Sequence, residues 1–417
     1  MASTEKPFYK KKWFPILSIV LCFLLANMFY SIANGHGPIP DFSIIEDVDK
    51  TEDGTYIMTD TSYRSMIDWT GAGITPNRIL EVDADNNVIW TMYGFAGLHE
   101  IEQVPNGNLL IADTHNDRVV EVNYPDKTTG WEWKPEEINW TKVNPAWGPD
   151  HYYNNPKTYD WSHLNDVDFY SYTNWNACLI SIRNFDLVVE VNFSAEMENP
   201  NQAENIVWYY GDYKNYDLIR HQHNPDYLPN GNIIICDSEN QRVVEVNRTT
   251  KQIVWEYNKI RGWCRDADQL PNGNILISES YSVYIINKTT QEKVWEFAKG
   301  TFASYDADLL SNGNILIGAS QAGKAYEVDP DTNEVVWEYG TTEVMGYVFI
   351  NCIIVIVLVL IGFGYLYRKD GKFDVKTHKV AVTTGIILII IPVLIMINFW
   401  SVANKVIIFL AITLNFA

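Results

Sequence analysis

The sequence predicts an all-β protein, a six-bladed β-propeller joined to one N-terminal and two C-terminal transmembrane helices. Two observations predict the propeller: one unit recurs six times between residues 41 and 340, and each copy contains four short strands. Three apolar stretches outside the repeat predict the helices. A period of about 40 residues with four strands per repeat is typical of propellers, whose blades close into a ring.

Each repeat combines an acidic first strand, a tight turn and aliphatic strands that end near a tryptophan. The clearest copies occupy residues 223–257, 265–297 and 305–340, and each contains an Asn-Gly turn between two apolar runs. Such a turn predicts a hairpin, and the aliphatic runs predict strands buried between neighbouring blades. The six blades are expected at 41–94, 97–134, 160–211, 219–257, 262–297 and 303–340, closed by Trp90, Trp133, Trp208, Trp255, Trp295 and Trp337.

The chain ends predict an integral membrane protein. The stretches 14–34, 346–367 and 380–400 are each long enough to span a bilayer. Basic residues before the first stretch and after the second place the N-terminus in the cytoplasm and the propeller outside the plasma membrane. A cleaved signal peptide is the alternative for the first stretch. The expected segments are 1–35 (N-terminus and helix), 36–345 (propeller), 346–367 (helix), 368–379 (cytoplasmic loop) and 380–417 (helix and short apolar tail).

Charge and cysteine usage narrow the function classes. Residues 36–345 contain 49 Asp and Glu against 21 Lys and Arg, in a chain of net charge −21. A surface this acidic argues against a nucleic-acid partner. The propeller cysteines are scattered, which predicts neither a disulfide framework nor a cysteine metal site. Four sequons predict a glycoprotein, although Asn-x-Thr also favours turns: Asn139, Asn192, Asn247 and Asn287.

Two insertions interrupt the repeat. Residues 61–77 lengthen the loop between the second and third strands of blade 1, and residues 135–159 lengthen the connection into blade 3. Both loops belong to the face where the innermost strands begin. Because they are rich in Trp, Tyr and Pro, they predict a binding rim or lid. A merely decorative loop is the alternative.

Polar residues recur where each innermost strand begins. Counting back from the turn selects Glu46, His99, His163, His223, Arg265 and Tyr305. Three positions further on, each blade has an acid: Asp49, Glu102, Asp166, Asp226, Asp268 and Asp308. We expect these acids to accept backbone N–H groups of the adjacent blade, with catalysis or metal binding as the alternative. The first set changes type from blade to blade and contains three of the eight histidines. Since imidazole can act as a nucleophile or an acid–base group, this set is the predicted site. Simple channel-lining residues are the alternative.

Arginines near the ends of second strands are further candidates. Arg183 follows the second strand of blade 3. Arg242 belongs to the pattern D-[ST]-x-N-x-R, which occurs at 113–118 and 237–242 and resembles the signature of NHL-repeat propellers. A pattern present in two blades favours an architectural role.

Four segments resemble, in order, the PAPS-independent aryl sulfotransferase family. They are DWSHLNDVDF (160–169), SIRNFD (181–186), RHQHNPDYLPNGN (220–232) and CDSENQR (236–242). The resemblance implies an exported six-bladed propeller that moves a sulfuryl group between phenols through a sulfohistidine. It implies sulfate-site histidines at His163 and His223 and a site arginine at Arg242. The family's later histidine, the one that becomes sulfated, has no counterpart, because blades 5 and 6 offer Arg265 and Tyr305.

We therefore expect His223 or His99 to be the nucleophile, with His163 beside it. Arg183, Arg242, Arg265, Asn165 and Tyr305 are the expected substrate-binding residues, and no metal or cofactor is expected. The partners would be a phenolic sulfate donor and a phenolic acceptor. A lipid-linked substrate is expected because the chain is expected to enter and leave the propeller on the face where this set of polar residues lies. A non-catalytic surface propeller for recognition or assembly is the main alternative. A lyase or hydrolase with a channel metal is the third.

Overall fold

The computed structural model describes residues 43–62, 77–148, 151–152, 160–194, 199–298, 301, 303–320 and 323–340. All of them belong to one compact unit, Phe42–Thr341. The helices expected at 1–35, 346–367 and 380–417, the loop 368–379 and most of the insertion 61–77 lie outside the described residues. Within those residues, none of the helices has the length and apolarity of a membrane span.

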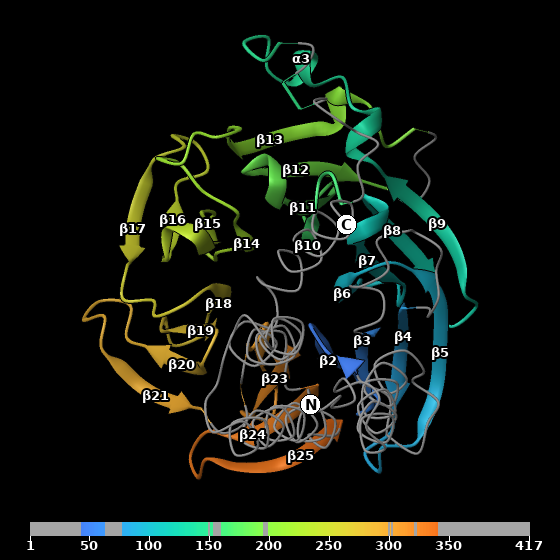
Figure 1. Cartoon of the computed structure of the whole chain (residues 1–417), viewed down its shortest axis with the longest axis vertical. Helices are drawn as coiled ribbons and strands as arrows, with labels where there is room; N and C mark the ends of the chain where they lie inside the picture. Colours follow the sequence, from blue (N-terminus) through green and yellow to red (C-terminus); the bar gives the residue numbers. More distant parts are fainter. Residues whose placement is uncertain are drawn as a thin grey trace, which may run out of the picture. The chain divides into compact units, whose positions relative to one another are not determined.

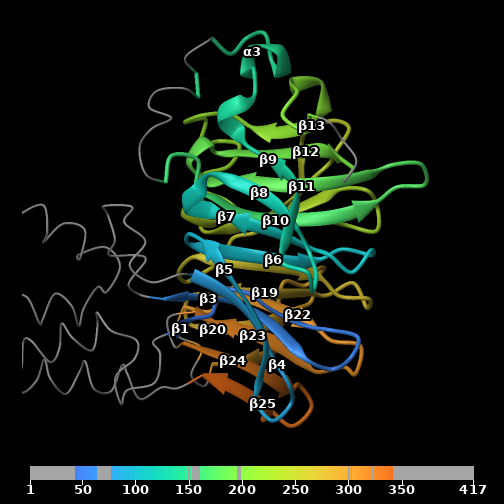
Figure 2. The same ribbon diagram turned by 90° about the vertical axis from the view of Figure 1, so that its right-hand side faces the viewer.

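The described unit is a six-bladed propeller, as predicted. Six antiparallel sheets are arranged in a ring around a central axis (Figure 1). Seen edge-on, the strands run through the thickness of the disc (Figure 2). In each blade the strands follow one another as a meander from the axis to the rim, so one inner strand per blade lines the axis.

The first three blades are formed by residues 43–211. Blade 1 contains β1 (Ser43–Ile44), β2 (Val48–Lys50), β3 (Tyr56–Ser62), β4 (Asn77–Val82) and β5 (Val88–Phe95). Blade 2 contains β6 (Leu98–Gln103), β7 (Leu109–Asp113), η2 (Thr114–Asn116), β8 (Arg118–Asn123) and β9 (Thr128–Trp133). Blade 3 follows η3 (Pro135–Glu137) and α3 (Trp140–Val143); it contains β10 (Leu164–Ser171), β11 (Asn176–Ile182), η4 (Arg183–Phe185), β12 (Leu187–Phe193), η5 (Ala203–Asn205) and β13 (Ile206–Gly211).

The last three blades are formed by residues 223–340. Blade 4 contains β14 (His223–Tyr227), β15 (Ile233–Asp237), η6 (Ser238–Asn240), β16 (Arg242–Val246) and β17 (Ile253–Tyr257). Blade 5 contains β18 (Cys264–Gln269), β19 (Ile275–Glu279), β20 (Ser282–Ile286) and β21 (Lys293–Phe297). Blade 6 contains β22 (Asp306–Leu309), β23 (Ile315–Ala319), β24 (Lys324–Asp329) and β25 (Glu334–Gly340).

The hydrophobic core is divided among the interfaces between blades, as expected for aliphatic strands packed face to face. Six clusters of buried residues occur, one at each interface. At the interface of blades 4 and 5, Ile234 and Val243 pack with Ile277 and Tyr284. Each sheet is therefore covered on both faces, which accounts for the near-continuous apolar runs in its strands.

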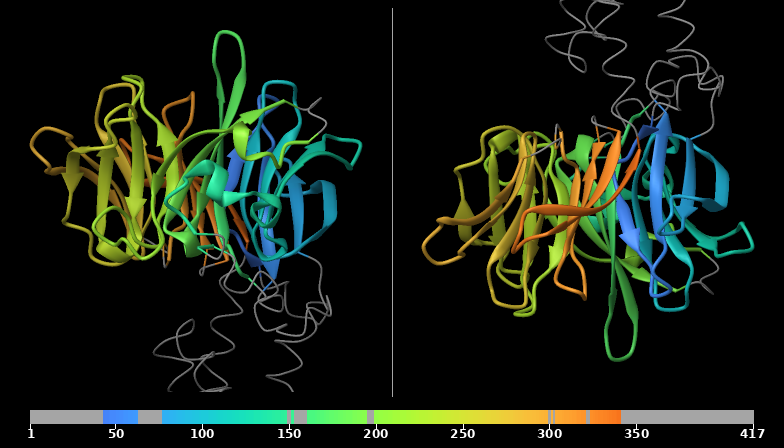
Figure 3. Two further views of the ribbon diagram at one scale, coloured as in Figure 1. Left: turned by 90° about the horizontal axis from the view of Figure 1, so that it is seen from above. Right: turned by 90° about the horizontal axis from the view of Figure 1, so that it is seen from below.

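The Asn-Gly turns join the first and second strands of a blade. In blade 2, the Gly107 N–H donates to Val104 O at 2.8 Å, and Gly107 has φ of 86°. Glycine adopts this left-handed conformation without the steric cost of a Cβ atom. The hairpin of β10 and β11 is longer than the others and projects from the face that carries these turns (Figure 3).

Tryptophans of the outermost strands connect each blade to the next. The indole N–H of Trp90, Trp208 and Trp255 donates to a backbone carbonyl in the third turn of the following blade, at 2.7–3.0 Å. The expected closing residue of blade 2 was wrong by two positions. Trp133 pairs with Val119 in the same way as Tyr257 pairs with Val243 in blade 4. The closing Trp255 lies two residues before Tyr257, so its equivalent in blade 2 is Trp131.

A glutamate on the third strand provides a second connection between blades. Glu245 accepts hydrogen bonds from the side chains of Asn230 and Asn232 in its own blade's first turn, and its carboxylate lies 2.6 Å from Lys288 Nζ of the following blade. Glu190 pairs in the same way with Arg248 of blade 4. The position therefore locks the first turn of one blade to a cation of the next.

The same chemistry closes the ring between blades 6 and 1. Glu327 lies 2.6 Å from both Lys50 Nζ and Tyr56 Oη of blade 1. Trp337 stacks on Tyr56, with ring centroids 3.5 Å apart. In the described chain no sheet combines strands from the two ends of the propeller, so side chains alone make this closure.

The insertion before blade 3 differs from the expected rim. Its described part, residues 135–148 with 151–152, lies at the periphery beyond β13 (Figure 1). Trp140, Trp147 and Tyr152 are buried in the core of blades 2 and 3, where Tyr152 stacks on Phe185 at 4.5 Å. The aromatic residues of this segment thus serve packing. Residues 153–159 lie outside the described part.

The reading of the cysteines also requires correction. Cys236 of β15 and Cys264 of β18 form a disulfide between blades 4 and 5, with Cα atoms 5.6 Å apart. The two residues are separated by 28 positions and become neighbours only through the packing of adjacent blades. Cys178 is a free, buried thiol.

Glu327→Gln should destabilise the propeller by about 2 kcal/mol, because it leaves Lys50 without its charged acceptor at a buried interface. The free energy of unfolding from denaturant titration measures the effect. Glu334→Gln is the matched control, since Glu334 is exposed on the same blade. Equal stability of both variants would contradict the assigned closure.

The effect of Glu327→Gln should depend on pH. Burial would raise the pKa of Glu327, but hydrogen bonds from Lys50, Tyr56 and two asparagines outweigh burial and lower it from 4.5 to about 2. A lowered folded-state pKa adds stability above pH 4.5 that is lost as the pH falls towards 2. The free energy of unfolding of the wild type should therefore exceed that of the variant by the full amount above pH 4.5, and this excess should vanish near pH 2. A constant difference over this range would refute the assignment.

Candidate functional site

The six residues of the predicted site lie together at one end of the channel and are called the ring below: Glu46, His99, His163, His223, Arg265 and Tyr305. His99 lies with its ring centroid 4.9 Å from that of His163 and 5.4 Å from that of Tyr305. His223 lies 5.7 Å from Tyr305 and accepts a hydrogen bond at Nε2 from Arg265 Nη1. The sixth residue, Glu46, places Oε2 3.1 Å from His99 Nδ1. Residues from all six blades thus meet at the start of the innermost strands.

Irregular backbone directs several of these side chains. In β6 and β18 the strand pairing shifts by one residue at His99 and Arg265, which leaves them as the extra residues of β-bulges. A bulge re-aims its side chain relative to a regular strand. His163 has φ of 48°, in the left-handed region, and precedes β10.

Blade 3 differs from the counted pattern. Asp168 pairs with Leu179 as Asp268 pairs with Leu276, so Asp168, rather than Asp166, is the register equivalent of the acids in the other blades. Asn165 consequently occupies the strand position of the ring, and His163 reaches the ring from the loop before it. Asn165 is buried, and its Nδ2 donates to Gln222 O of blade 4 at 2.9 Å.

The bonding of the three ring histidines defines their tautomers. Nδ1 of His99 lies 2.9 Å from Gly97 O, and Nδ1 of His223 lies 3.1 Å from His221 O. Since a carbonyl only accepts, each Nδ1 carries the proton. His163 Nδ1 lies 2.8 Å from both oxygens of Asp160. All three neutral imidazoles therefore keep a lone pair on Nε2.

Burial controls the charge of the ring. It lowers the pKa of His99, His163 and His223 well below 6.5, with further lowering from Arg265. Burial also raises the pKa of Glu46 to about 8, against the opposing effect of Arg265. At neutral pH the histidines are thus uncharged bases, and Glu46 is largely a neutral acid.

Arg265 is the partly buried cation of the ring. Its guanidinium carbon lies 4.7 Å from the Trp263 ring and 5.2 Å from the Tyr305 ring. Burial lowers the pKa of Arg265, but an arginine stays protonated in proteins. In the part of the chain that the structure describes, no carboxylate forms an ion pair with it. A partly buried cation without a counter-ion favours an anionic ligand.

The two other candidate arginines differ in their surroundings. Arg183 begins η4 beside the ring, where its charge lowers the pKa of His163 and His223, and its Nη2 lies 3.7 Å from Glu239 Oε1. Arg242 contacts Asp237 and Glu256 instead, at 2.7 and 3.3 Å. Arg118 repeats this arrangement in blade 2 with Asp113 and Glu132. Arg242 is therefore part of the repeated architecture and makes no contact with the ring residues.

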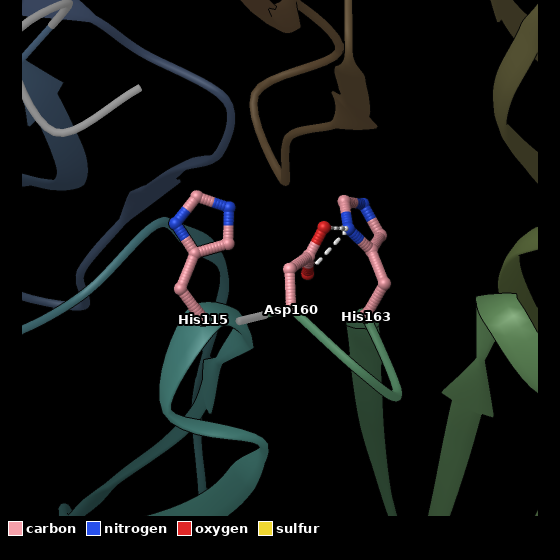
Figure 4. A group of neighbouring side chains, drawn as sticks. All are labelled: His115, Asp160 and His163. Atoms are coloured by element: carbon pink, nitrogen blue, oxygen red, sulfur yellow. Dashed lines mark hydrogen bonds and ion pairs between the residues drawn. The ribbon is translucent and has the colours of Figure 1, made fainter. Parts of the chain in front are cut away.

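A group of three further ligand-type residues adjoins the ring. His115, Asp160 and His163 present ligand atoms that all lie within 4.8 Å of one another, with Asp160 between the two imidazoles (Figure 4). Burial raises the pKa of Asp160 to about 6, so it is mostly ionised at neutral pH. Two imidazoles and a carboxylate form a donor set that suits zinc or a similar transition metal.

Several residues of the site escaped the sequence reasoning. His115 and Asp160 lie on loops of different blades and meet only in the folded ring. Thr114 and Ser238 contact Nδ1 of His99 and His223 at 3.0 and 2.8 Å. Both are the [ST] residue of the D-[ST]-x-N-x-R pattern. The pattern could therefore have identified these two residues from the sequence, because the hydroxyl at its [ST] position orients a ring histidine.

The acidic positions follow the structural expectation only in part. Backbone N–H groups of the next blade donate to Asp47 and Asp266, from Ile101 at 2.6 Å and Ala307 at 3.0 Å. These acids lie two positions before the predicted Asp49 and Asp268. The backbone N–H groups that we expected Asp49 and Asp268 to accept are thus accepted by Asp47 and Asp266.

Comparison with known proteins supports the repeats of the later blades. Residues 201–348 match the family model described as outer membrane protein assembly factor BamB. A search of curated protein sequences finds no match. The similar solved structures include a protein of unknown function from Bacteroides caccae, with 12% identity and TM-score 0.45, covering 64% of this chain and 91% of that one. A streptogramin B lyase has 12% identity and TM-score 0.44, with coverage of 73% and 84%.

Virginiamycin B lyase from Staphylococcus aureus is similar at 8% identity and TM-score 0.44, covering 72% of this chain and 85% of that one. Likenesses this remote carry no argument about activity. The family model matches fewer than half of the residues. The chain is thus a six-bladed β-propeller whose later repeats are similar to those of the BamB family.

Proposed function

We propose that the protein is a sulfuryl transferase that acts between phenols, with the donor sulfate bound at the ring. The observation that carries the proposal is Arg265, a partly buried guanidinium whose described contacts include no carboxylate and whose Nη1 touches His223 Nε2. An anionic group bound to Arg265 would place its central atom beside a neutral imidazole lone pair. The resemblance of blades 3 and 4 to aryl sulfotransferases supports the same chemistry.

His223 is the proposed nucleophile. Arg265 Nη1 donates to His223 Nε2 in the structure, and it must turn to the sulfate oxygens when the donor binds. The freed Nε2 lone pair then attacks sulfur, an S–N bond forms, and the S–O bond to the aryl group breaks with its electron pair leaving on the phenolate. Arg265 and Arg183 stabilise the charge on the sulfuryl oxygens. Glu46 is mostly protonated at neutral pH, so it can supply the proton that the departing phenolate takes.

The second half-reaction reverses these steps with an acceptor. The acceptor phenol attacks the sulfuryl group on His223, the S–N bond breaks, and the Glu46 carboxylate takes back the phenol proton. His99 and His163 line the space as neutral acceptors of hydrogen bonds from the two phenols. Asp160 fixes the His163 tautomer that presents Nε2.

We extend the proposal to the substrate source and the location of the protein. Ser43 pairs with the end of β3 and Gly340 with the start of β24, so the described propeller begins and ends on the ring face. Apolar stretches adjoin both ends in the sequence. This arrangement fits an extracellular propeller at the plasma membrane. Its substrate would be a phenol that is lipid-linked or dissolved in the membrane.

A non-catalytic role in recognition or assembly is the second candidate. The match to a family named for outer membrane protein assembly favours it. In that case a partner would bind at the disc surface, and neutralising the buried ring would leave its binding unchanged.

His223→Gln should lower sulfuryl transfer from 4-nitrophenyl sulfate to a phenol by at least about 100-fold, because the nucleophile is lost. Release of nitrophenolate measures turnover, and mass spectrometry of wild type mixed with donor alone should detect one sulfuryl group on His223. His151→Gln is the control, since His151 pairs with Asp212 outside the ring. Wild-type turnover in the His223 variant would eliminate this mechanism.

Arg265→Met should weaken binding of the aryl sulfate by about tenfold to 100-fold, since a charged hydrogen bond to the anion contributes about 1.5–3 kcal/mol. Calorimetric titration with a slow-reacting aryl sulfate measures the change. Arg261→Met, an exposed arginine of the same connection, should bind like wild type. Equal affinity in both variants would show that the anion site lies elsewhere.

A further inference from the structure

The channel below the ring is lined by two tiers of acidic side chains. Strand register places the upper tier one position after the ring and the lower tier two positions further on. The upper tier is Asp47, Glu100, Asp166, Asp266 and Asp306, with Asn224 in blade 4. The lower tier is Asp49, Glu102, Asp168, Asp226, Asp268 and Asp308.

These tiers enclose a cavity of about 310 Å³. Every carboxylate of both tiers except Asp266 lines it, and the other lining residues are Val167, Asn224, Gln269, Leu270, Pro271 and Leu309. No lysine, arginine or histidine is among the lining residues that the structure describes. The cavity reaches Leu270 and Pro271 at the first turn of blade 5, so it opens away from the histidine ring.

Some of these carboxylates are held by the protein, and others are not. Asp47 and Asp266 accept backbone N–H groups from the next blade. In contrast, Oδ2 of Asp166 and Oδ2 of Asp306 have no hydrogen-bond partner within the described residues, although the two residues are only 2% and 7% exposed. Both line the cavity. A buried polar oxygen without a partner is costly, which points to a ligand in the cavity.

The chemistry of the lining selects the kind of ligand. Ten carboxylates face a space without a basic residue among its described lining, so the lining favours a cation as the occupant. The donors are oxygens with no nitrogen or sulfur, which favours a hard ion such as Ca²⁺ over zinc or copper. Since a water occupies about 30 Å³ in the liquid, the cavity holds about ten, enough for an ion with part of its hydration shell.

We propose that the channel between the two acidic tiers is a site for a hydrated divalent cation, with Ca²⁺ preferred, which carboxylates from several blades hold largely through the waters of its hydration shell. The ion would connect the innermost strands at the axis, where the described chain has no backbone pairing between blades. This site is distinct from the His115–Asp160–His163 group and requires no sulfuryl transfer.

Calorimetric titration of the chelator-treated full-length protein with Ca²⁺, and separately with Mg²⁺, tests the site. Wild type should bind saturably, and Ca²⁺ should raise the thermal unfolding midpoint. The double variant Asp166→Asn with Asp268→Asn should bind at least about tenfold more weakly, because ligand charge sets affinity. Glu52→Gln with Asp53→Asn, two exposed acids, should bind like wild type.

The double variant should be at least as stable as wild type in chelator, because two repelling charges are removed. If it does not fold, the single variant Asp308→Asn replaces it with the same expected loss of affinity. Saturable binding of either ion that the channel variant loses supports the site. Absence of binding to wild type at millimolar Ca²⁺ and Mg²⁺, or equal affinity in the channel variant, would overturn the proposal and assign protons as the neutralising species. Aryl sulfate binding at Arg265 should be unchanged in the channel variant.

Discussion

Three of the six blade junctions share one interaction on which the spacing of those blades depends, the link from a third-strand glutamate to a cation of the following blade. Glu190, Glu245 and Glu327 each bind a cation that belongs to the next blade in the ring. The same carboxylate at Glu245 and Glu327 also accepts the side chains of the first turn. A third-strand glutamate thus fixes both the first hairpin of its own blade and the spacing between that blade and the next. The position of the central channel, and of everything that lines it, follows from that spacing.

This scaffold supports a channel with two chemically different ends. Neutral imidazoles and Arg265 occupy one end, whereas carboxylates line the other. The difference arises along the inner edge of each blade, where the ring position is followed by the upper-tier residue at the next position and by the lower-tier acid two positions later. A strand period of two places the two tiers one above the other, and β-bulges at His99 and Arg265 re-aim these ring residues. The propeller therefore keeps an anion-attracting site and a cation-attracting site on one axis.

The sequence predicted well what local chemistry determines. Blade limits followed from Asn-Gly turns and tryptophans, and the ring residues of blades 2, 4, 5 and 6 followed from a constant distance to the turn. Counting failed in blade 3 because the β10–β11 hairpin is longer, so His163 and Asp166 were placed two positions early. The Cys236–Cys264 pair and the His115–Asp160 contact depend on packing between blades. No local pattern encodes which loops of separate blades will meet.

The closure of the ring has a consequence for chain connectivity. Every described blade is a continuous segment, and the junction of blades 6 and 1 uses the same glutamate–cation link as the junctions of blades 3 and 4 and of blades 4 and 5. The junction where the propeller chain begins and ends is therefore equivalent in bonding to those that a peptide connection crosses. A circular permutation that opens one of those connections and joins residues 43 and 340 would preserve all six interfaces.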